Sequence, residues 1–458
     1  MDARHPPAAQ VVIEDAMTDA LPRDSHHPLV TTLRFFADPE GTLDRCAREQ
    51  GDPFHLKLLG VGDMIVTSTP EHLRELFSAR PELFTPPWTD NLAPLLGGHS
   101  LLLLAGEAHR RERRLMMPSF HGDRMRAYGA VIQQITHRAL AARRPGPLVA
   151  LTLSQEIALE VIIQCVFGVT EPDAVARCRA AVSAFVDAYT PALVLFPGLR
   201  RGLFGDRGPW ARFVRNRAAF EALLLDEVAR RRARHEPGRE DILSLLLDAR
   251  DEDGEGLTDQ ELADELRTLL IGGYETTANT LAWAMDLAVR DPEVRRRVLA
   301  EIDALGATPE PAALAQLPYL GAVCQETIRM RPVLSVVGRQ TVAPFTFAGR
   351  EVPIGTVLGA AIFHLHHRPA LYPDPERFDP ERFLQRKFGP FEFIGFGGGA
   401  RRCMGAAFAT YLLRVSLGTM LAGFHWRCAS PEPLAIVRRG VGFGPARGGP
   451  LVLQGLRG

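Results

Sequence analysis

A glycine-rich run that holds one cysteine constrains this chain more than any other feature. The run reads Phe-Gly-Gly-Gly-Ala-Arg-Arg-Cys-Met-Gly over residues 396–405, so that Cys403 follows two arginines. Consecutive glycines let a backbone turn tightly and approach a flat ligand closely. Arginines, exposed backbone N–H groups and the start of a helix, which the apolar residues 406–409 predict, all favour a thiolate over a thiol. The run therefore predicts that Cys403 is a thiolate ligand, of the kind that binds haem iron.

Fixed positions of this run resemble the haem-binding signature of the cytochrome P-450 superfamily. The matching positions are Phe396, Gly399, Arg401, Cys403 and Gly405. The resemblance implies a haem b cofactor, with Cys403 as the axial ligand of iron and the other four residues in contact with the cofactor. The alternative is a buried structural cysteine beside a glycine-rich turn, which would not require the five positions together.

Composition narrows the class of protein and its compartment. The 458 residues carry a formal net charge of -1, which excludes a general basic field for nucleic acid. The six cysteines include no CxxC pair, so a local zinc or iron–sulfur cluster is not expected, and scattered cysteines suit a reducing cytoplasm. Residues 1–23 contain four acids and no long apolar run, so neither a signal peptide nor a membrane anchor is expected.

Sequence periodicity predicts a mainly α-helical protein with a small β region. Alternating residues predict strands at 54–58 and 64–67, and Pro70 begins a helix that reaches residue 77. Residues 1–28 are polar and are expected to be flexible. The resemblance implies one domain over residues 29–458, with the family's prism-shaped fold and a long distal helix over the haem. Further helices are expected at 153–167, 212–234 and 241–247, because their apolar residues recur with the helical period. Short strands are expected within 336–362.

The distal helix is expected over residues 259–289, because a Thr-x-x-Glu capping box at 258–261 precedes this apolar-periodic segment. The pair Gly272-Gly273 lies in mid-helix, where each glycine costs helix stability. Close helix–helix packing explains the pair, and so does a local opening of the helix that admits a small ligand. Glu275 and Thr276 follow and resemble the family's oxygen-activation motif. The resemblance implies that Thr276 holds dioxygen and a water molecule, while Glu275 helps to deliver protons.

An acid and an arginine at i, i+3 lie in a predicted helix at Glu326 and Arg329. As an exposed pair they would contribute well under about 1 kcal/mol. The family joins such a pair to a downstream arginine, here Arg382. The resemblance therefore implies a buried ion network beneath the haem, which is structural and not catalytic.

Haem carries two propionates, and buried carboxylates need cations. His109 and Arg113 share a helix face at i, i+4, and the resemblance assigns them to one propionate and Arg339 to the other, with Arg401 as a further cation. The alternative for the run at 109–114 is a solvated basic face. Six further arginine and lysine residues are expected to form a basic patch on which an acidic electron donor docks. They are Arg110, Arg111, Arg114, Arg386, Lys387 and Arg402.

The resemblance implies a soluble monooxygenase that inserts one oxygen atom of dioxygen into an apolar substrate, such as a fatty acid, a terpenoid or a polyketide-like compound. Because the chain has no flavin or iron–sulfur motif, electrons from NAD(P)H would arrive through a separate ferredoxin or flavodoxin and its reductase. Arg401, Glu275 and residues 391–394 resemble a cyanobacterial and myxobacterial branch. A cytoplasmic monomer is expected. Core packing explains the candidate pocket residues equally well; they are Trp88, Leu269, Gly272, Thr280, Val336 and Val337.

Two rival functions stay open from the sequence. A haem-thiolate peroxygenase or isomerase would need no redox partner, although such members of the family lose the acid–threonine pair that is kept here at residues 275–276. A haem-binding partner protein without turnover is the second rival. Its relatives lose the threonine or the cysteine loop, whereas both are present in this chain.

Overall fold

The computed structural model describes residues 26–59, 61–120, 124–190, 192–193, 197–200, 205–234, 236, 238–439 and 442–457. Of the segment predicted to be flexible, residues 1–25 lie outside this part, and Pro28 begins a helix. Helices dominate, and short strands form small sheets, so the predicted fold class is confirmed. The helices are α1 (Pro28–Ala37), α2 (Pro39–Gln50), α3 (Pro70–Ser78), α4 (Thr89–Leu96), α5 (Gly106–Met116), α6 (Arg124–Ala141), α7 (Ala150–Val161), α8 (Pro172–Ala188), α10 (Pro209–Ala233), α11 (Ile242–Asp248), α12 (Asp259–Arg290), α13 (Pro292–Asp303), α14 (Pro311–Gln316), α15 (Pro318–Met330), α16 (Ile362–His366), α17 (Glu381–Gln385) and α18 (Ala406–Gly423).

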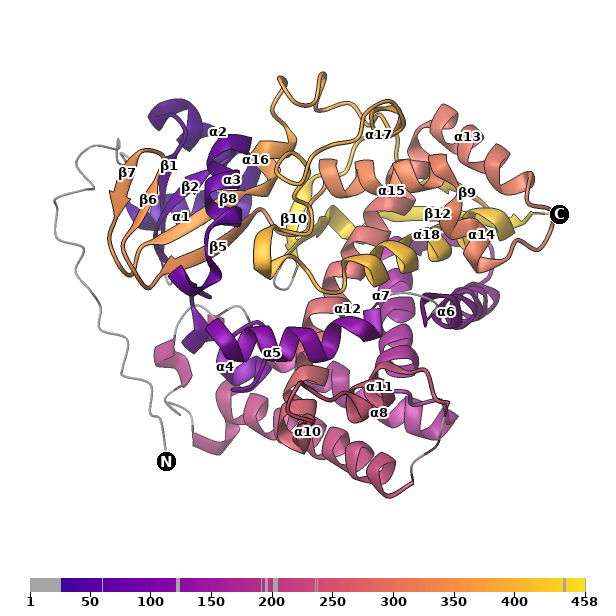
Figure 1. The fold of residues 1–458 in the computed structure, drawn as a ribbon. Helices are drawn as coiled ribbons and strands as arrows, with labels where there is room; N and C mark the ends of the chain where they lie inside the picture. The colour runs from indigo at the N-terminus through magenta and orange to yellow at the C-terminus, as the bar shows by residue number, and fades with distance from the viewer. Residues whose placement is uncertain are drawn as a thin grey trace.

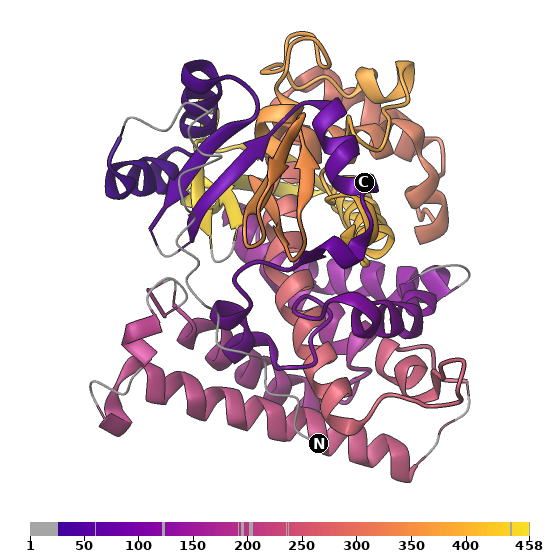
Figure 2. The same cartoon turned by 60° about the vertical axis from the view of Figure 1, so that its left-hand side comes forward.

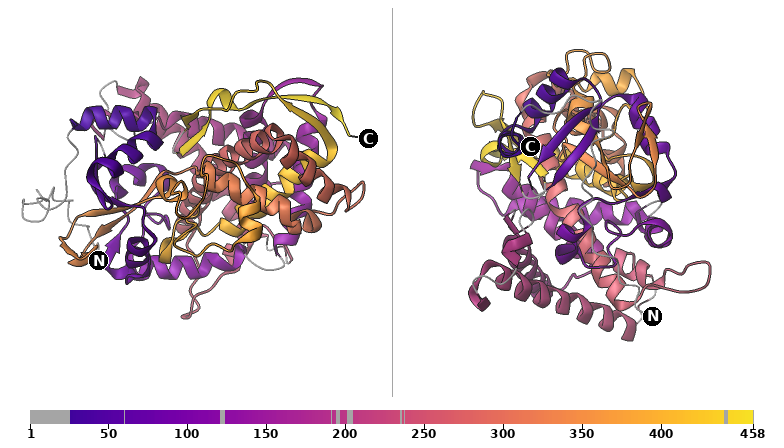
Figure 3. Two further views of the ribbon diagram at one scale, coloured as in Figure 1. Left: turned by 90° about the horizontal axis from the view of Figure 1, so that it is seen from above. Right: turned by 90° about the vertical axis from the view of Figure 1, so that its left-hand side faces the viewer.

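The strands within residues 54–67 and 345–361 lie at one end of the molecule, whereas those at 424–428 and 450–456 lie toward the opposite end (Figures 1 and 3). A five-stranded sheet has the order β1-β2-β8-β5-β3, in which β2 and β8 are parallel and the other neighbours are antiparallel. A three-stranded sheet has the order β4-β12-β9, and two hairpins complete the β structure. The strands are β1 (Phe54–Leu58), β2 (Gly62–Thr67), β3 (Phe84–Thr85), β4 (Gly146–Val149), β5 (Val336–Thr341), β6 (Phe345–Phe347), β7 (Arg350–Val352), β8 (Val357–Ala361), β9 (Phe424–Cys428), β10 (Ile436–Arg439), β11 (Gly442–Pro445) and β12 (Pro450–Leu456).

Helix α12 runs through the centre of the molecule (Figures 1 and 2). Its capping box is present: the Glu261 N–H donates to Thr258 Oγ1 at 3.2 Å, and the Thr258 N–H donates to a Glu261 carboxylate oxygen at 2.7 Å. Helices α7, α10, α15 and α18 pack around it. A helix enclosed in this way is apolar on most of its circumference, which explains the long apolar-periodic segment in the sequence.

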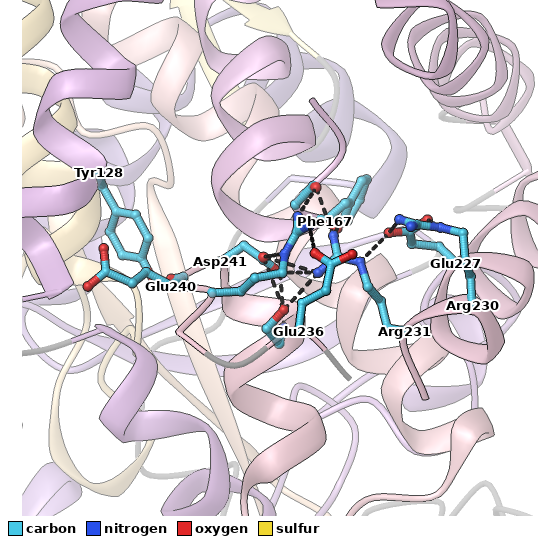
Figure 4. Close-up of polar contacts among 11 residues, drawn as sticks. Tyr128, Phe167, Glu227, Arg230, Arg231, Glu236, Glu240 and Asp241 are labelled. Carbon is cyan, nitrogen blue, oxygen red and sulfur yellow. Dashed lines mark hydrogen bonds and ion pairs between the residues drawn. The ribbon is translucent and has the colours of Figure 1, made fainter. Parts of the chain in front are cut away.

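The end of α10 is fixed by a buried arginine, Arg231, which is 4% exposed. Its guanidinium donates to Asp241 at 3.1 Å, to Ser244 Oγ at 2.7 Å and to the Gly168 carbonyl at 2.7 Å (Figure 4). Asp241 is also the N-cap of α11, since its carboxylate accepts from the Ser244 N–H at 3.0 Å. One side chain thus holds α10, α11 and the segment after α7 together.

Helix α18 is long and apolar enough to cross a membrane by composition alone, and it is the one such helix in the described part of the chain. Most of it is buried inside the protein, where α6, α12, α14 and α15 pack against it. These contacts explain its apolar composition, because a core helix surrounded by other helices needs few polar positions.

Candidate functional site

The cysteine loop is held between α3 and the start of α18. The Cys403 N–H donates to the Phe396 carbonyl at 2.9 Å, which closes the loop. Gly399 has φ +64°, and a Cβ at that position would lie 2.4 Å from the Phe77 carbonyl oxygen of α3. An added Cβ at Gly398 would lie 2.3 Å from the Phe77 ring. These glycines are therefore required by backbone conformation and by close approach to Phe77.

Cys403 is the exposed cysteine of the chain: Cys46, Cys165, Cys178 and Cys324 are buried and Cys428 is intermediate. Protein atoms nevertheless surround its thiol on the sides that do not face solvent, and this partial burial raises the pKa of Cys403. The Gly405 N–H, Arg402 and Arg113 oppose that rise, because each favours the thiolate. The loop therefore presents a sulfur that is accessible to a ligand and has positive partners.

Gly405 differs from the other glycines of the loop. Its φ is -78°, which any residue adopts, and no atom of the described residues lies within 4 Å of an added Cβ. Nothing in the protein itself therefore requires glycine there. A flat group lying against the loop at this point would require it, and this observation fits a haem.

A cluster of cations lies around the loop. Arg113 donates to the Arg402 carbonyl at 2.8 Å, Arg339 donates to the Gly398 carbonyl at 3.1 Å, and Arg401 donates to the Leu104 carbonyl. No carboxylate of the described residues forms an ion pair with Arg113, Arg339 or Arg401. An anionic group bound here would meet three guanidinium groups that no carboxylate of the described residues neutralises.

The pKa values of these arginines are lowered, as expected for buried cations without a neighbouring carboxylate. Burial lowers the pKa of Arg339 to about 10. Burial also lowers the pKa of Arg401 to about 10, and repulsion from Arg339 and Arg113 adds to this. His109 is 5% exposed. Its burial lowers its pKa to about 4, and repulsion from the charges of Arg401, Arg113 and Arg339 contributes to this shift. The two propionates of a haem would supply the missing negative charge, so the residues present fit that group.

One face of α12 carries Leu269, Gly272, Thr276 and Thr280, which are spaced by three or four residues. Gly272 is exposed in the middle of this long helix, and an added Cβ would meet no atom of the described residues within 4 Å. Close helix packing therefore does not explain Gly272. The predicted local opening is also not found, because α12 continues through this point as regular α-helix. The glycine instead leaves space beside an unbroken helix.

A helical irregularity that the sequence did not predict lies in the segment that packs beside α12. The period of 153–167 continues from α7 into a π-helical turn, η4 (Ile162–Val166), that packs on α12. An added Cβ at Gly273 would lie 3.5 Å from Ile162 Cδ1, which is an ordinary van der Waals contact. Thr276 Oγ1 donates to the Gly272 carbonyl at 2.5 Å, so the hydroxyl lies along the helix beside the glycine.

Glu275 lies on a different side of α12 and lines a polar cavity. The cavity is also lined by Gln155 of α7, Arg439 of β10, and Arg447 of η8 (Ala446–Gly448). Asn279 completes it one turn along α12, and its amide donates to the Glu275 carbonyl at 2.9 Å. Sequence reasoning missed this cavity, because its residues come from distant segments that only the fold brings together.

The remaining pocket candidates lie in different environments. The Trp88 indole N–H donates to the Val61 carbonyl at 2.5 Å, and a Cβ at Gly338 would lie 3.3 Å from its ring, so Trp88 packs against the sheet. Val336 and Val337 are neighbours on β5 and pack into different apolar clusters. Successive residues of a strand point to opposite faces, so the two valines cannot both face one pocket.

Glu326 and Arg329 are fully buried, and Arg382 is 8% exposed. Arg329 donates two hydrogen bonds to the Glu326 carboxylate, at 2.7 Å and 2.8 Å, and Arg382 donates to Glu326 Oε1 at 3.1 Å. Arg329 also donates to the His366 carbonyl at 2.8 Å. The three residues therefore join α15, α16 and α17 in one ion network.

The basic patch expected around the cysteine loop is largely neutralised. Arg110 lies 2.9 Å from Glu82 and 3.0 Å from Glu107, and Arg111 lies 2.7 Å from Asp251. Arg114 and Arg386 also form ion pairs, with Glu252 and Glu392. The sequence could not show these pairs, because most of the acids lie far along the chain. A patch built from all six basic residues was therefore the wrong expectation.

Comparison with known proteins identifies the family. The sequence model described as Cytochrome P450 matches residues 22–448. This chain belongs to the cytochrome P450 family. It is 37% identical over 382 residues to cytochrome P450 135B1 of Mycobacterium tuberculosis, covering 83% of this chain and 79% of that protein. It is 32% identical over 429 residues to cytochrome P450 138 of the same species, covering 92% and 93%.

Solved structures of P450 proteins have the same fold. The structure described as retinoic acid bound cyanobacterial CYP120A1 superposes with a TM-score of 0.82 at 26% identity, covering 94% of this chain and 98% of that one. The heme domain of a cytochrome P450DA mutant gives a TM-score of 0.81 at 23% identity. Membership of the family identifies this P450 as a haem-dependent monooxygenase with a thiolate ligand.

Proposed function

We propose that this P450 inserts one atom of dioxygen into a lipophilic substrate, with electrons that pass from NAD(P)H through a reductase and a separate ferredoxin or flavodoxin. The observation that carries the proposal is the accessible sulfur of Cys403 beside a cation cluster that has no carboxylate partner among the described residues. The family supports the reaction class. Residues 29–458 act as one cytoplasmic domain in this proposal, and the protein is a monomer.

Haem b is the proposed cofactor, and when bound through a thiolate it supplies the activation of dioxygen. Cys403 Sγ is the ligand of iron. Arg113, Arg339 and Arg401 would hold the propionates, and His109, which is buried beside these cations, would contribute a further hydrogen bond. Phe396, Gly399 and Gly405 give the loop the shape that accepts the ring. Glu326, Arg329 and Arg382 fix the elements beneath it and take no part in the chemistry.

Proton delivery is assigned to Thr276 and Glu275. The Thr276 hydroxyl lies beside Gly272, where α12 carries no side chain, and it can exchange its bond to the Gly272 carbonyl for one to a reacting oxygen atom. Glu275 faces the polar cavity with Gln155 and Arg439. A carboxyl group in contact with such a cavity can take a proton from water and pass it along α12.

The substrate is proposed to be a fatty acid, a terpenoid or a polyketide-like compound. Leu269, Gly272 and Thr280 share the α12 face with Thr276, and Val336 or Val337 approaches from β5. The retinoic acid named for the cyanobacterial structure is an apolar acid of a similar class. Trp88 contributes through packing of the sheet.

A turnover assay tests the proposal. Purified protein is supplied with NADPH and a surrogate ferredoxin and ferredoxin reductase, and in parallel with hydrogen peroxide alone, and a lipid library is screened by mass spectrometry. The proposal predicts a product with one added oxygen that requires the reductase system and incorporates label from ¹⁸O₂. Product formed only with peroxide would identify a peroxygenase instead. Haem binding without product in either arm would favour the non-catalytic rival.

A further inference from the structure

A polar cavity of about 280 Å³ lies where α12 meets α7 and the hairpin of β10 and β11. It is the cavity that Glu275 lines, and two of its other side chains are arginines, Arg439 and Arg447. With these three groups ionised, two positive charges face one negative charge, which leaves one positive charge in the lining. The remaining walls are mixed: the start of α7 contributes polar groups, whereas Val149 and Leu151 are apolar.

The position of Arg439 depends on a glycine in the opposite strand of the hairpin. Val437 of β10 lies opposite Gly444 of β11, and Arg439 is on the same face of β10 two residues further along. An added Cβ at Gly444 would lie 3.0 Å from Arg439 Cγ and 2.0 Å from Oδ1 of Asn279 in α12. The glycine therefore allows the arginine to cross the hairpin and allows the hairpin to pack on α12 beside the cavity.

Arg447 lies at the cavity in a constrained turn. Its φ is +52°, in the left-handed region that residues with a side chain rarely adopt. On one side of it, the Ala446 N–H donates to the Ala435 carbonyl at 2.8 Å. On the other side, the Ala150 N–H of α7 donates to the Gly449 carbonyl at 2.9 Å. A strained conformation persists only where its surroundings determine it, so the fold holds the backbone of Arg447 in a fixed position beside the cavity.

The described residues leave both arginines without a carboxylate partner. No carboxylate among them forms an ion pair with Arg439 or Arg447, and Arg439 Nε is buried without a hydrogen-bond partner. A guanidinium group binds a carboxylate through two parallel hydrogen bonds, which makes the pairing specific in geometry. The volume lies near the lower limit for small-molecule sites. A small ligand with one carboxylate and an apolar body would therefore match the charge, the apolar wall and the size of this cavity.

We propose that this cavity binds a small monocarboxylate through Arg439 and Arg447. The site is separate from the α12 face that carries Thr276, because Glu275 and Asn279 lie on a different side of the helix. Its effect on turnover rests on the proposed function: a ligand in the cavity displaces the water from which Glu275 would take protons. Proton delivery then slows, and less product forms for each NADPH consumed.

Isothermal titration calorimetry on the haem-loaded protein tests the site, with benzoate as the probe and benzamide as its uncharged counterpart. An azole that ligates haem iron is present throughout, so that the measured heat reports on binding away from the haem. Benzoate is expected to bind about tenfold more tightly than benzamide or better. Arg439→Gln and Arg447→Gln should each weaken benzoate binding by about tenfold, because each loses charge-assisted hydrogen bonds. Arg427→Gln, which removes an exposed arginine of β9, should bind benzoate as the wild type does.

Equal affinity of the wild type for benzoate and benzamide would overturn the proposal, and this comparison needs no variant to fold. Unchanged benzoate affinity in both cavity variants, Arg439→Gln and Arg447→Gln, would overturn it as well. A separate turnover assay then measures product per NADPH consumed at saturating benzoate, where a fall is expected. If calorimetry shows the cavity occupied and the product yield does not change, the binding site stands and the proposed role of Glu275 fails. Normal turnover without benzoate binding would be the reverse result.

Discussion

Gly399 and Gly405 lie in one loop, but different causes make them glycine. Gly399 has a positive φ and touches the Phe77 carbonyl, whereas Gly405 has ordinary φ and open space beside it. Gly399→Ala is expected to cost about 1–3 kcal/mol of stability because it strains the backbone and forces Phe77 away. Gly405→Ala should leave the fold intact and reduce haem content. Thermal unfolding measures the effect on stability, and the ratio of haem to protein measures the effect on haem binding. If the two variants lost the same amount of haem and had the same stability, the distinction between the two glycines would be contradicted.

Candidate site residues could be named from the sequence, but their surroundings could not be predicted. The run at 396–405 pointed to Cys403 as the candidate ligand, because its pattern of glycine and arginine is local. The environment of Glu275 could not be predicted, since Gln155, Arg439 and Arg447 reach it from distant segments. Trp88 was expected in the pocket from its apolar character alone, which does not distinguish a pocket wall from the packing against the sheet that the structure shows.

At the scale of elements, one buried ion network joins α15 to α16 and α17. Arg329→Met would leave the Glu326 carboxylate buried without its bidentate partner, and a loss of about 3–5 kcal/mol of stability is expected. Arg296 and Glu293 form a control pair with the same i, i+3 spacing, with side chains 66% and 62% exposed. Arg296→Met should cost less than about 1 kcal/mol. Denaturant unfolding compares the two, and similar losses would contradict a special role for the buried network.

The open face of α12 carries two threonines in equivalent local geometry. Thr276 Oγ1 donates to the Gly272 carbonyl and Thr280 Oγ1 donates to the Thr276 carbonyl at 2.8 Å. Because Thr276 lies beside the exposed glycine, Thr276→Val is expected to lower the product formed per NADPH consumed by about tenfold or more. Thr280→Val should change substrate affinity instead. Product yield and spectral substrate titration separate the effects, and equal coupling in both variants would contradict the assignment.

The boundaries of an element could be predicted where the sequence contains a helix cap or a clear alternation of apolar and polar residues. The capping box placed the start of α12 at residue 259, and the alternating residues 54–58 became β1 without change. The π-helical turn η4 after α7 was not foreseeable, because its residues Ile162–Val166 continue the same apolar pattern. The local opening expected in α12 is not found, since α12 is an unbroken helix at Gly272-Gly273. A glycine pair shows only that two side chains are absent, and the packing around the helix decides whether its backbone also opens.

At the scale of the whole molecule, stability is expected to depend on buried acids. Burial raises the pKa of Glu40 to about 8, and its Oε1 has no partner among the described residues. The protonated carboxyl is favoured in the fold, so its contribution is complete below the unfolded pKa and is lost as pH rises through about 8. The free energy of unfolding of Glu40→Gln, taken relative to that of the wild type, should therefore increase as the pH rises from acidic to alkaline values. Unfolding curves at several pH values test this, and a constant difference would contradict it.

In the proposed site, Cys403 binds haem iron as a thiolate and the surrounding cations complete the site. The most direct test is the absorption spectrum of the reduced protein under carbon monoxide, recorded for the wild type, for Cys403→Ser and for Cys428→Ser as a matched cysteine control. Thiolate ligation by Cys403 should give a strongly red-shifted Soret band in the wild type and in Cys428→Ser, and this band should be lost in Cys403→Ser. A wild-type band without the shift, or a shift that survives in Cys403→Ser, would contradict it.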